Sequence, residues 1–291
     1  IDSKQLNEDD QISLTLLEFV LENKILSYEF KTHWNPILSD AGFHNNLTYD
    51  VQPISTKTGA LNYLKKLNAV PNYIEQQMDL IRKGLEAGMG QPLVIFKGYE
   101  STYTMHITET AEENFYYSPF LNLPDGISQN DKDSLQTAAA EIVSTKIIPT
   151  FQRIKTFFEK EYYPKTRTEI GVSTTPNGKA YYQNRIDYYT TLELSAEEIH
   201  EIGLKEVARI RNRMEEIIAS LNFEGDFSAF IQFLRTAPQF YAETPDELLM
   251  HARNIAKKLD EQLPRYFITL PRKPYGVAPV PDAVTPLPTK F

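Results

Sequence analysis

The histidines are the residues of this chain best suited to bind a metal ion or to carry a proton. The 291 residues include five of them, His33, His44, His106, His200 and His251. No two lie within four positions of each other, so the sequence lacks the His-x-x-x-His pair that holds zinc on a helix. His200 and Glu201 begin such a motif, but Leu204 occupies the position of its second histidine.

Glu197 and His200 have the Glu-x-x-His spacing of carboxylate-bridged di-iron helices, which project both side chains from one face. Such sites need a second Glu-x-x-His on another helix, and this sequence has none. A di-metal helical oxidase would therefore rest on these two residues alone. The alternative, which we favour, is that the acidic cluster caps and solvates a helix start.

The other common catalytic signals are missing. Cysteine is absent, which excludes disulfides, thiolate nucleophiles and cysteine-bound zinc. No Gly-x-Ser-x-Gly elbow occurs. The 30 basic and 39 acidic residues give a net charge of -9, which argues against a nucleic-acid partner. No run approaches the roughly 18 apolar residues that a transmembrane segment needs.

A cluster of tyrosines around one arginine is the strongest candidate for a binding site. Tyrosine offers a broad apolar face with one hydrogen-bonding tip, and arginine can fork onto a carboxylate. We therefore expect one wall of a peptide-binding site to be formed by Tyr182, Arg185, Tyr189, Thr190, Thr191 and His200. The alternative is that these tyrosines pack between helices with their hydroxyls satisfied.

Helical signals dominate the chain, so the sequence predicts a mainly α fold, a multi-helix assembly. Ser195 and Glu198 form a capping box, and apolar residues follow it at helical spacing. Long helices are expected at 8–33, 131–163, 196–221 and 245–263. Shorter helices are expected at 59–68, 71–88, 91–107 and 226–235, although 91–107 also contains a strand-like run.

The prolines indicate where these helices are interrupted. Pro149 should kink the helix 131–163 because its ring removes an amide donor. Residues 264–291 hold seven of the 18 prolines, which predicts an extended segment and excludes regular helix. We expect one helical domain over 1–263, with a subdivision near 110–130, followed by the extended segment 264–291.

Several segments of the chain resemble the bacterial DUF885 family, whose complete members resemble zinc metallopeptidases of the HExxH type. The most specific of them runs from Thr190 to Leu204, TTLELSAEEIHEIGL. The others are Leu61–Gly88, Ile147–Pro164 with its Glu-Tyr-Tyr-Pro exit, and Tyr275–Pro281 with the sequence YGVAPVP. The resemblance covers most of the chain from about Leu61 onward.

The resemblance implies that this chain is the amino-terminal, helical half of such a protein. In complete members an HExxPGH motif follows, whose histidines would bind zinc and whose glutamate would activate water. Those positions are absent here, so we expect no catalytic residue and no cofactor in this chain, and zinc only in the complete protein. The expected partners are the missing carboxyl-terminal half and peptides, and an exported periplasmic protein or lipoprotein is the expected setting. The alternative is a non-catalytic helical binding or scaffold protein of the bacterial envelope.

Overall fold

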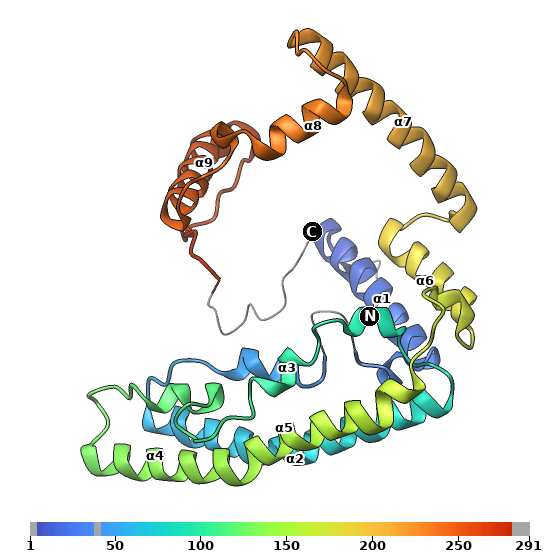
Figure 1. The fold of residues 1–291 in the computed structure, drawn as a ribbon. Helices are drawn as coiled ribbons and strands as arrows, with labels where there is room; N and C mark the ends of the chain where they lie inside the picture. Colours follow the sequence, from blue (N-terminus) through green and yellow to red (C-terminus); the bar gives the residue numbers. More distant parts are fainter. Residues whose placement is uncertain (1–4, 38–41, 281–291) are drawn as a thin grey trace. The chain divides into compact units, whose positions relative to one another are not determined.

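The computed structural model describes residues 5–37 and 42–280, and in these residues the chain is built from helices without a β-strand (Figure 1). The prediction of a mainly α fold is confirmed. The longer α-helices are α1 (Glu8–Glu29), α2 (Lys57–Glu86), α4 (Gln129–Ile142), α5 (Ile148–Phe157), α6 (Gly178–Thr190), α7 (Ala196–Ser220), α8 (Phe227–Thr236) and α9 (Pro245–Tyr266). The single turn α3 (Ser101–Thr104) and short 3₁₀ and π turns connect them.

The chain divides into two compact units. The described residues up to Glu193 form the first unit, and those from Leu194 onward form the second. The first unit contains α1 to α6, and the second contains α7 to α9. The predicted subdivision near 110–130 is not where this division falls, and the proposed domain 1–263 stays a prediction.

Helices α2, α4 and α5 lie side by side and enclose the core of the first unit (Figure 1). Helix α2 was expected as two helices separated before Pro71, and this prediction is wrong. The apolar stripe of α2 stays in phase through the proline, with Leu67, Ile74 and Met78 each at most 2% exposed. Burial of these side chains outweighs the single backbone hydrogen bond that the proline ring removes.

Pro149 interrupts α-helical geometry without ending the helix. The five residues immediately before α5, Val143–Ile147, form a π-helical turn, η6. A second π turn, η7 (Phe158–Tyr162), follows α5. A proline cannot donate a backbone hydrogen bond, and the wider turn before it accommodates that loss. The α-helical geometry is therefore interrupted before Pro149 as predicted, and the kink stays a prediction.

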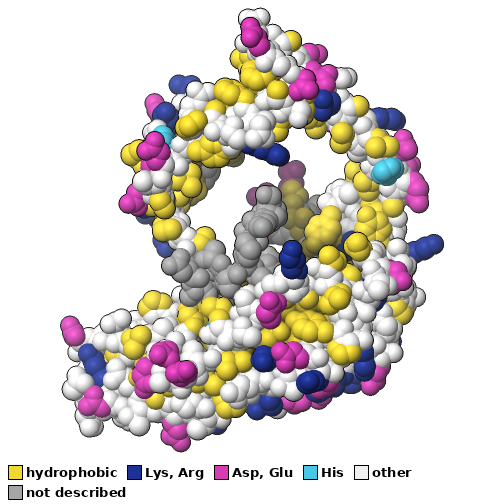
Figure 2. All heavy atoms as spheres, in the orientation of Figure 1, with side chains coloured by type: hydrophobic (Ala, Val, Ile, Leu, Met, Phe, Trp, Pro, Cys, Tyr) yellow, Lys and Arg dark blue, Asp and Glu magenta, His cyan; other side chains and the backbone are white. Residues whose placement is uncertain are grey.

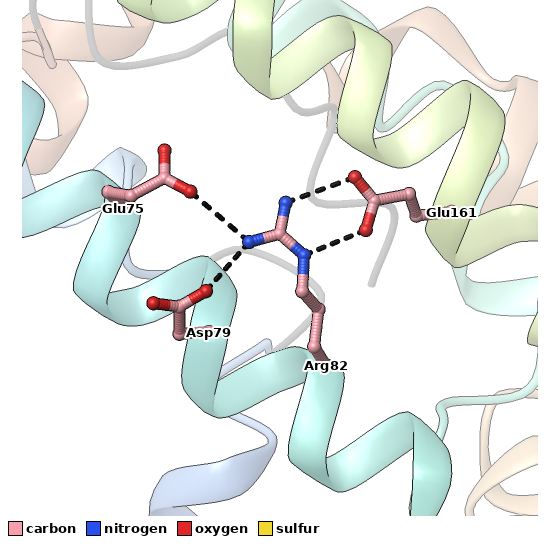
Figure 3. A network of polar contacts seen from close by, with 4 residues as sticks. All are labelled: Glu75, Asp79, Arg82 and Glu161. Carbon is pink, nitrogen blue, oxygen red and sulfur yellow. Dashed lines mark hydrogen bonds and ion pairs between the residues drawn. The ribbon is translucent and has the colours of Figure 1, made fainter.

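An arginine joins α2 to η7 at the end of the core (Figure 3). Nε and Nη2 of Arg82 donate to the two carboxylate oxygens of Glu161 at 2.7 and 3.0 Å. Nη1 also donates to Asp79 at 2.8 Å and to Glu75 at 3.2 Å. The hydrogen bond from Arg82 lowers the pKa of the Glu161 carboxyl. This bidentate pair fixes two helices that approach each other from distant parts of the sequence.

The segment 91–107 was expected to be a helix, and this is wrong for most of its length. Leu93–Phe96 form a 3₁₀ turn, η4, and a left-handed Gly98 with φ of 80° separates it from α3. Pro92 lies in an isolated parallel bridge with Arg167 instead of starting a helix. The bridge occupies the backbone of Leu93, which donates to the Arg167 carbonyl at 3.1 Å.

The second unit follows the predicted caps closely. Ser195 and Glu198 form the capping box of α7, and Thr244 caps α9. Helix α9 continues through Pro264 to Tyr266, so the exclusion of helix from Pro264 onward is wrong for its first turn. From there to 280 the chain contains no regular helix or strand, and the remainder of the predicted extended segment, 281–291, lies outside the described residues.

Candidate functional site

A pocket of about 330 Å³ lies within the first unit. It is bounded by the end of α1, the segment after it, the end of α2, the turn η9 (Val172–Thr174) and the start of α6. The residues that line it are Phe30, Thr32, Asn35, Pro36, Gly42, Asn46, Met89, Gln91, Arg167, Val172, Thr175, Pro176 and Tyr181. This volume is at the lower end of the range for small-ligand sites, which begins at about 300 Å³.

Arg167 is held in the wall of this pocket by neutral oxygen atoms. Its Nε donates to the Gly90 carbonyl at 2.6 Å. Its Nη1 donates to the carbonyls of Glu169 and Gly171, both at 3.0 Å, and to Thr174 Oγ1 at 2.8 Å. The isolated bridge to Pro92 fixes the backbone beneath the side chain. The guanidinium is therefore held in one orientation before any ligand arrives.

The lining of the pocket is positively charged, although the chain as a whole is acidic. Among the described residues that line it, Arg167 alone carries a charge. Arg167 forms no ion pair with any described carboxylate. The nearby Glu169 carboxyl has a lowered pKa, first because of hydrogen bonds to its own backbone and to Thr168, and to a smaller extent because of Arg167. Among the residues that the structure describes, the positive charge in the pocket wall has no direct counter-ion.

Two of the three amide side chains in the wall are held by hydrogen bonds to backbone carbonyls. Asn35 Nδ2 donates to the Met89 carbonyl at 2.6 Å, and Gln91 Nε2 donates to the Ile37 carbonyl at 2.9 Å. Behind them the buried Tyr162 hydroxyl accepts from the Gln91 backbone amide at 3.0 Å. Burial raises the pKa of Tyr162 to about 12, so this hydroxyl remains a neutral donor and acceptor.

The predicted tyrosine and arginine block forms α6, and it touches the pocket through its first turn. Tyr181 lines the pocket and meets Phe30 edge to face at 5.6 Å. The Arg185 guanidinium lies 5.5 Å from the Tyr181 ring centre and 5.1 Å from that of Tyr188. Arg185 also donates to Asn23 on α1. The block therefore joins α1 to α6 and supports the aromatic side of the pocket.

The other predicted site residues lie outside the pocket lining. Tyr182 and Tyr189 are 48% and 77% exposed. Thr190 Oγ1 donates to the Ile186 carbonyl at 2.8 Å, and Thr191 ends α6 in a left-handed conformation with φ of 55°. His200 is exposed on α7, in the second unit. The structure thus brings Arg185 close to the pocket wall, and it leaves the peptide-binding roles of these residues untested.

The histidines do not assemble a zinc site in this part of the protein. His44 and His106 are buried among aromatic rings at 0% and 1% exposure. Within the residues that the structure describes, no group of three or more histidine, cysteine, aspartate or glutamate side chains is placed to hold a metal ion. The donor set that zinc requires does not fit the residues present, so no catalytic step through zinc is derived for this chain.

Sequence reasoning did not find Asn35, Gln91 or Arg167. These three residues lie far apart in the chain, and none belongs to a periodic pattern or a known motif. The bridge between Pro92 and Arg167 and the hydrogen bond from Asn35 to the Met89 carbonyl bring them together. The one local signal was Tyr181, which stands at the edge of the predicted block.

The described part of the protein is helical, and its first unit contains a small pocket whose lining carries one positive charge. The family model for the bacterial proteins of unknown function called DUF885 matches residues 1–290. The chain therefore belongs to the DUF885 family, and the predicted resemblance is confirmed. No curated protein matches the sequence.

A solved structure supports this assignment. It is described as "the putative lipoprotein from Colwellia psychrerythraea", and it is similar to this chain with a TM-score of 0.68 and 26% sequence identity. The similarity covers 76% of this chain and 39% of that one. The chain thus spans about two fifths of the length of its solved relative. In the described part of the chain, no helix has the length and apolar character of a membrane span.

Proposed function

We propose that this chain is the helical, peptide-binding part of a larger DUF885 protein that acts as a zinc metallopeptidase. The observation that carries the proposal is the difference in length, since the chain matches the family almost from end to end but spans 39% of its solved relative. The metal-binding residues would belong to the remaining part of the protein. This part alone would bind peptides and would not hydrolyse them.

The pocket supports the binding role. It combines a fixed cation, three amide side chains and the aromatic faces of Phe30 and Tyr181, which is the mixture of groups that small-ligand sites use. In this proposal Tyr182, Arg185, Tyr189, Thr190 and Thr191 extend the binding surface along α6, and His200 contributes from α7. Replacing Arg185 with alanine should then weaken peptide binding while the fold is retained. A lower thermal stability with unchanged binding would make the block structural.

The second unit supports a partner surface. Apolar side chains recur along α7 at helical spacing, and they remain about half exposed in Ile202, Ile210 and Ile217. Further exposed apolar side chains follow on α9 and after it, including Leu248, Ile255, Leu259, Phe267 and Ile268. Figure 2 shows such hydrophobic side chains at the surface of these helices. We assign this surface to contact with the remaining, catalytic part of the protein.

The test compares the 291-residue chain with the full-length product of its gene. Zinc would be quantified in both, and hydrolysis of a fluorogenic peptide would be followed with and without a chelator. The proposal expects zinc and chelator-sensitive hydrolysis in the full-length product alone. Stoichiometric zinc and hydrolysis in the 291-residue chain would overturn the proposal.

A second candidate is a non-catalytic helical binding or scaffold protein of the bacterial envelope. The description of the Colwellia psychrerythraea protein as a lipoprotein favours this candidate and an exported location for this chain. The same experiment separates the two functions. A full-length product that binds peptides without zinc or hydrolysis would select the second.

A further inference from the structure

We propose that the pocket of the first unit recognises the free carboxyl terminus of a peptide. Arg167 would bind the carboxylate, and the aromatic pair Phe30 and Tyr181 would contact the last side chain. This inference rests on the proposed peptide-binding function and specifies the part of the peptide that is bound.

The Arg167 guanidinium has the geometry of a prepared anion site. Nε and Nη1 are fully engaged by four neutral oxygen acceptors. Nη2 donates to no described residue, which leaves its N–H groups for a ligand. Because the side chain is already fixed, little conformational entropy is lost when an anion binds. A flexible surface arginine lacks this advantage.

The charge around Arg167 selects a monoanion. The pocket contains one positive charge and no acidic lining residue among those described, and a dianionic phosphate would call for more cations than this. A carboxylate balances one guanidinium. The chain as a whole carries a net charge of -9, so attraction for an acidic ligand must come from this local contact and not from a long-range field.

The remaining groups fit the end of a peptide chain. Phe30 and Tyr181 meet edge to face at 5.6 Å, and Pro36, Met89 and Pro176 complete an apolar lining for one side chain. Gln91 Nε2 is used by the Ile37 carbonyl. The Gln91 Oε1 atom is left to accept from a backbone N–H of the bound peptide. Carboxylate, amide and side chain thus each have a complementary group in one small pocket.

The test uses the 291-residue chain and isothermal titration calorimetry with the tripeptide Ala-Ala-Phe, as the free acid and as the carboxyl-terminal amide. We expect the acid to bind about 10- to 100-fold more tightly than the amide, because a hydrogen bond to a charged group contributes that much to affinity. Arg167→Gln should remove the difference. Equal affinity for acid and amide would overturn the inference.

Three further variants separate a local contact with Arg167 from a diffuse charge effect. Asn46→Asp is isosteric and adds a negative charge at the pocket edge, so it should weaken binding of the acid more than that of the amide. Arg265→Gln removes an exposed arginine from α9 and should leave both affinities unchanged. Arg185→Gln should weaken acid and amide alike. A preference for the acid that survives Arg167→Gln and disappears with Arg185→Gln would contradict the assignment.

Competition by inorganic phosphate tests whether the pocket prefers a carboxylate to a phosphate. It should compete poorly with the tripeptide acid, and competition as strong as that of the acid itself would contradict the selection of a carboxylate. The binding assay needs no catalytic part, so its result is independent of hydrolysis. Peptide hydrolysis by the full-length product without a preference for the acid would sink this inference and leave the proposed function standing.

Discussion

Lowering the pH from 7 to 5 should destabilise the first unit by about 4 kcal/mol, because two imidazoles are buried there in the neutral form. His44 Nε2 contacts the Thr102 hydroxyl at 2.8 Å, and that hydroxyl donates to the Tyr99 carbonyl at 2.7 Å. His44 Nε2 must therefore donate, which leaves Nδ1 as a buried acceptor without a partner among the described residues. Burial lowers the pKa of His44 to about 3, with a further contribution from His106. Burial lowers the pKa of His106 to about 4.

The direction of the effect follows from these values. In the unfolded chain both imidazoles titrate near pH 6.5. Below that pH the unfolded state therefore binds protons at these two histidines, whereas the native state keeps them neutral. Stability is complete above pH 6.5 and is lost as the pH falls toward the native pKa values. Each histidine contributes about 2 kcal/mol between pH 7 and pH 5, from a slope of about 1.36 kcal/mol per pH unit. Stopping at pH 5 keeps most carboxyl groups ionised.

Urea unfolding at pH 7 and pH 5 measures this difference. The single tryptophan, Trp34, belongs to the first unit, so its fluorescence reports on the relevant transition. His106→Leu should remove about half of the pH dependence, whereas His200→Gln on exposed α7 should leave it unchanged. Equal wild-type stability at both pH values would refute this prediction. So would a variant lacking both His44 and His106 that loses as much stability between pH 7 and pH 5 as the wild type does.

The remaining predictions concern helix contacts and caps. Gly84→Ala should destabilise the first unit by about 2 kcal/mol, because the added Cβ would lie 2.3 Å from the Trp34 carbonyl oxygen. Gly203→Ala should stabilise α7 by about 0.8 kcal/mol, because outside the backbone of α7 no described atom lies within 4 Å of the added Cβ. Thermal unfolding that ranks the two variants in the opposite order would contradict the packing. Arg82→Lys should cost about 1 kcal/mol through loss of the bidentate contact despite the retained charge, and an unchanged urea midpoint would show that the network contributes nothing. Ser195→Ala should cost about 1 kcal/mol by removing a helix cap, a loss measurable as reduced helicity by circular dichroism on heating, and undiminished helicity would argue against the capping box.

The sequence predicted those elements whose signals are local. The capping box of Ser195 and Glu198 and the cap at Thr244 depend on residues three positions apart, and both occur as expected. Pro71 and Pro264 were taken as helix boundaries, yet each lies inside a helix. Around Pro71 the outcome depends on which side chains find partners across the core, and a local pattern holds no information about those partners.

The residues of the pocket were harder still to predict from local sequence patterns. Its walls join residues from Phe30 to Tyr181, and the position of Arg167 depends on a bridge to Pro92 in a segment that the sequence assigned to helix. The tyrosine and arginine block drew attention to α6, whose Tyr181 lines the pocket, because tyrosines and arginine cluster there. The arginine that lines the pocket lies in an isolated bridge within a segment without any distinguishing pattern, so only the tertiary structure reveals it.

The most direct test of the central claim is peptide hydrolysis by the full-length gene product, measured beside the 291-residue chain with zinc quantified in both samples. We predict chelator-sensitive hydrolysis and bound zinc in the full-length protein, and peptide binding without hydrolysis in this chain. Hydrolysis by the 291-residue chain alone, or a full-length protein with neither zinc nor peptidase activity, would contradict it.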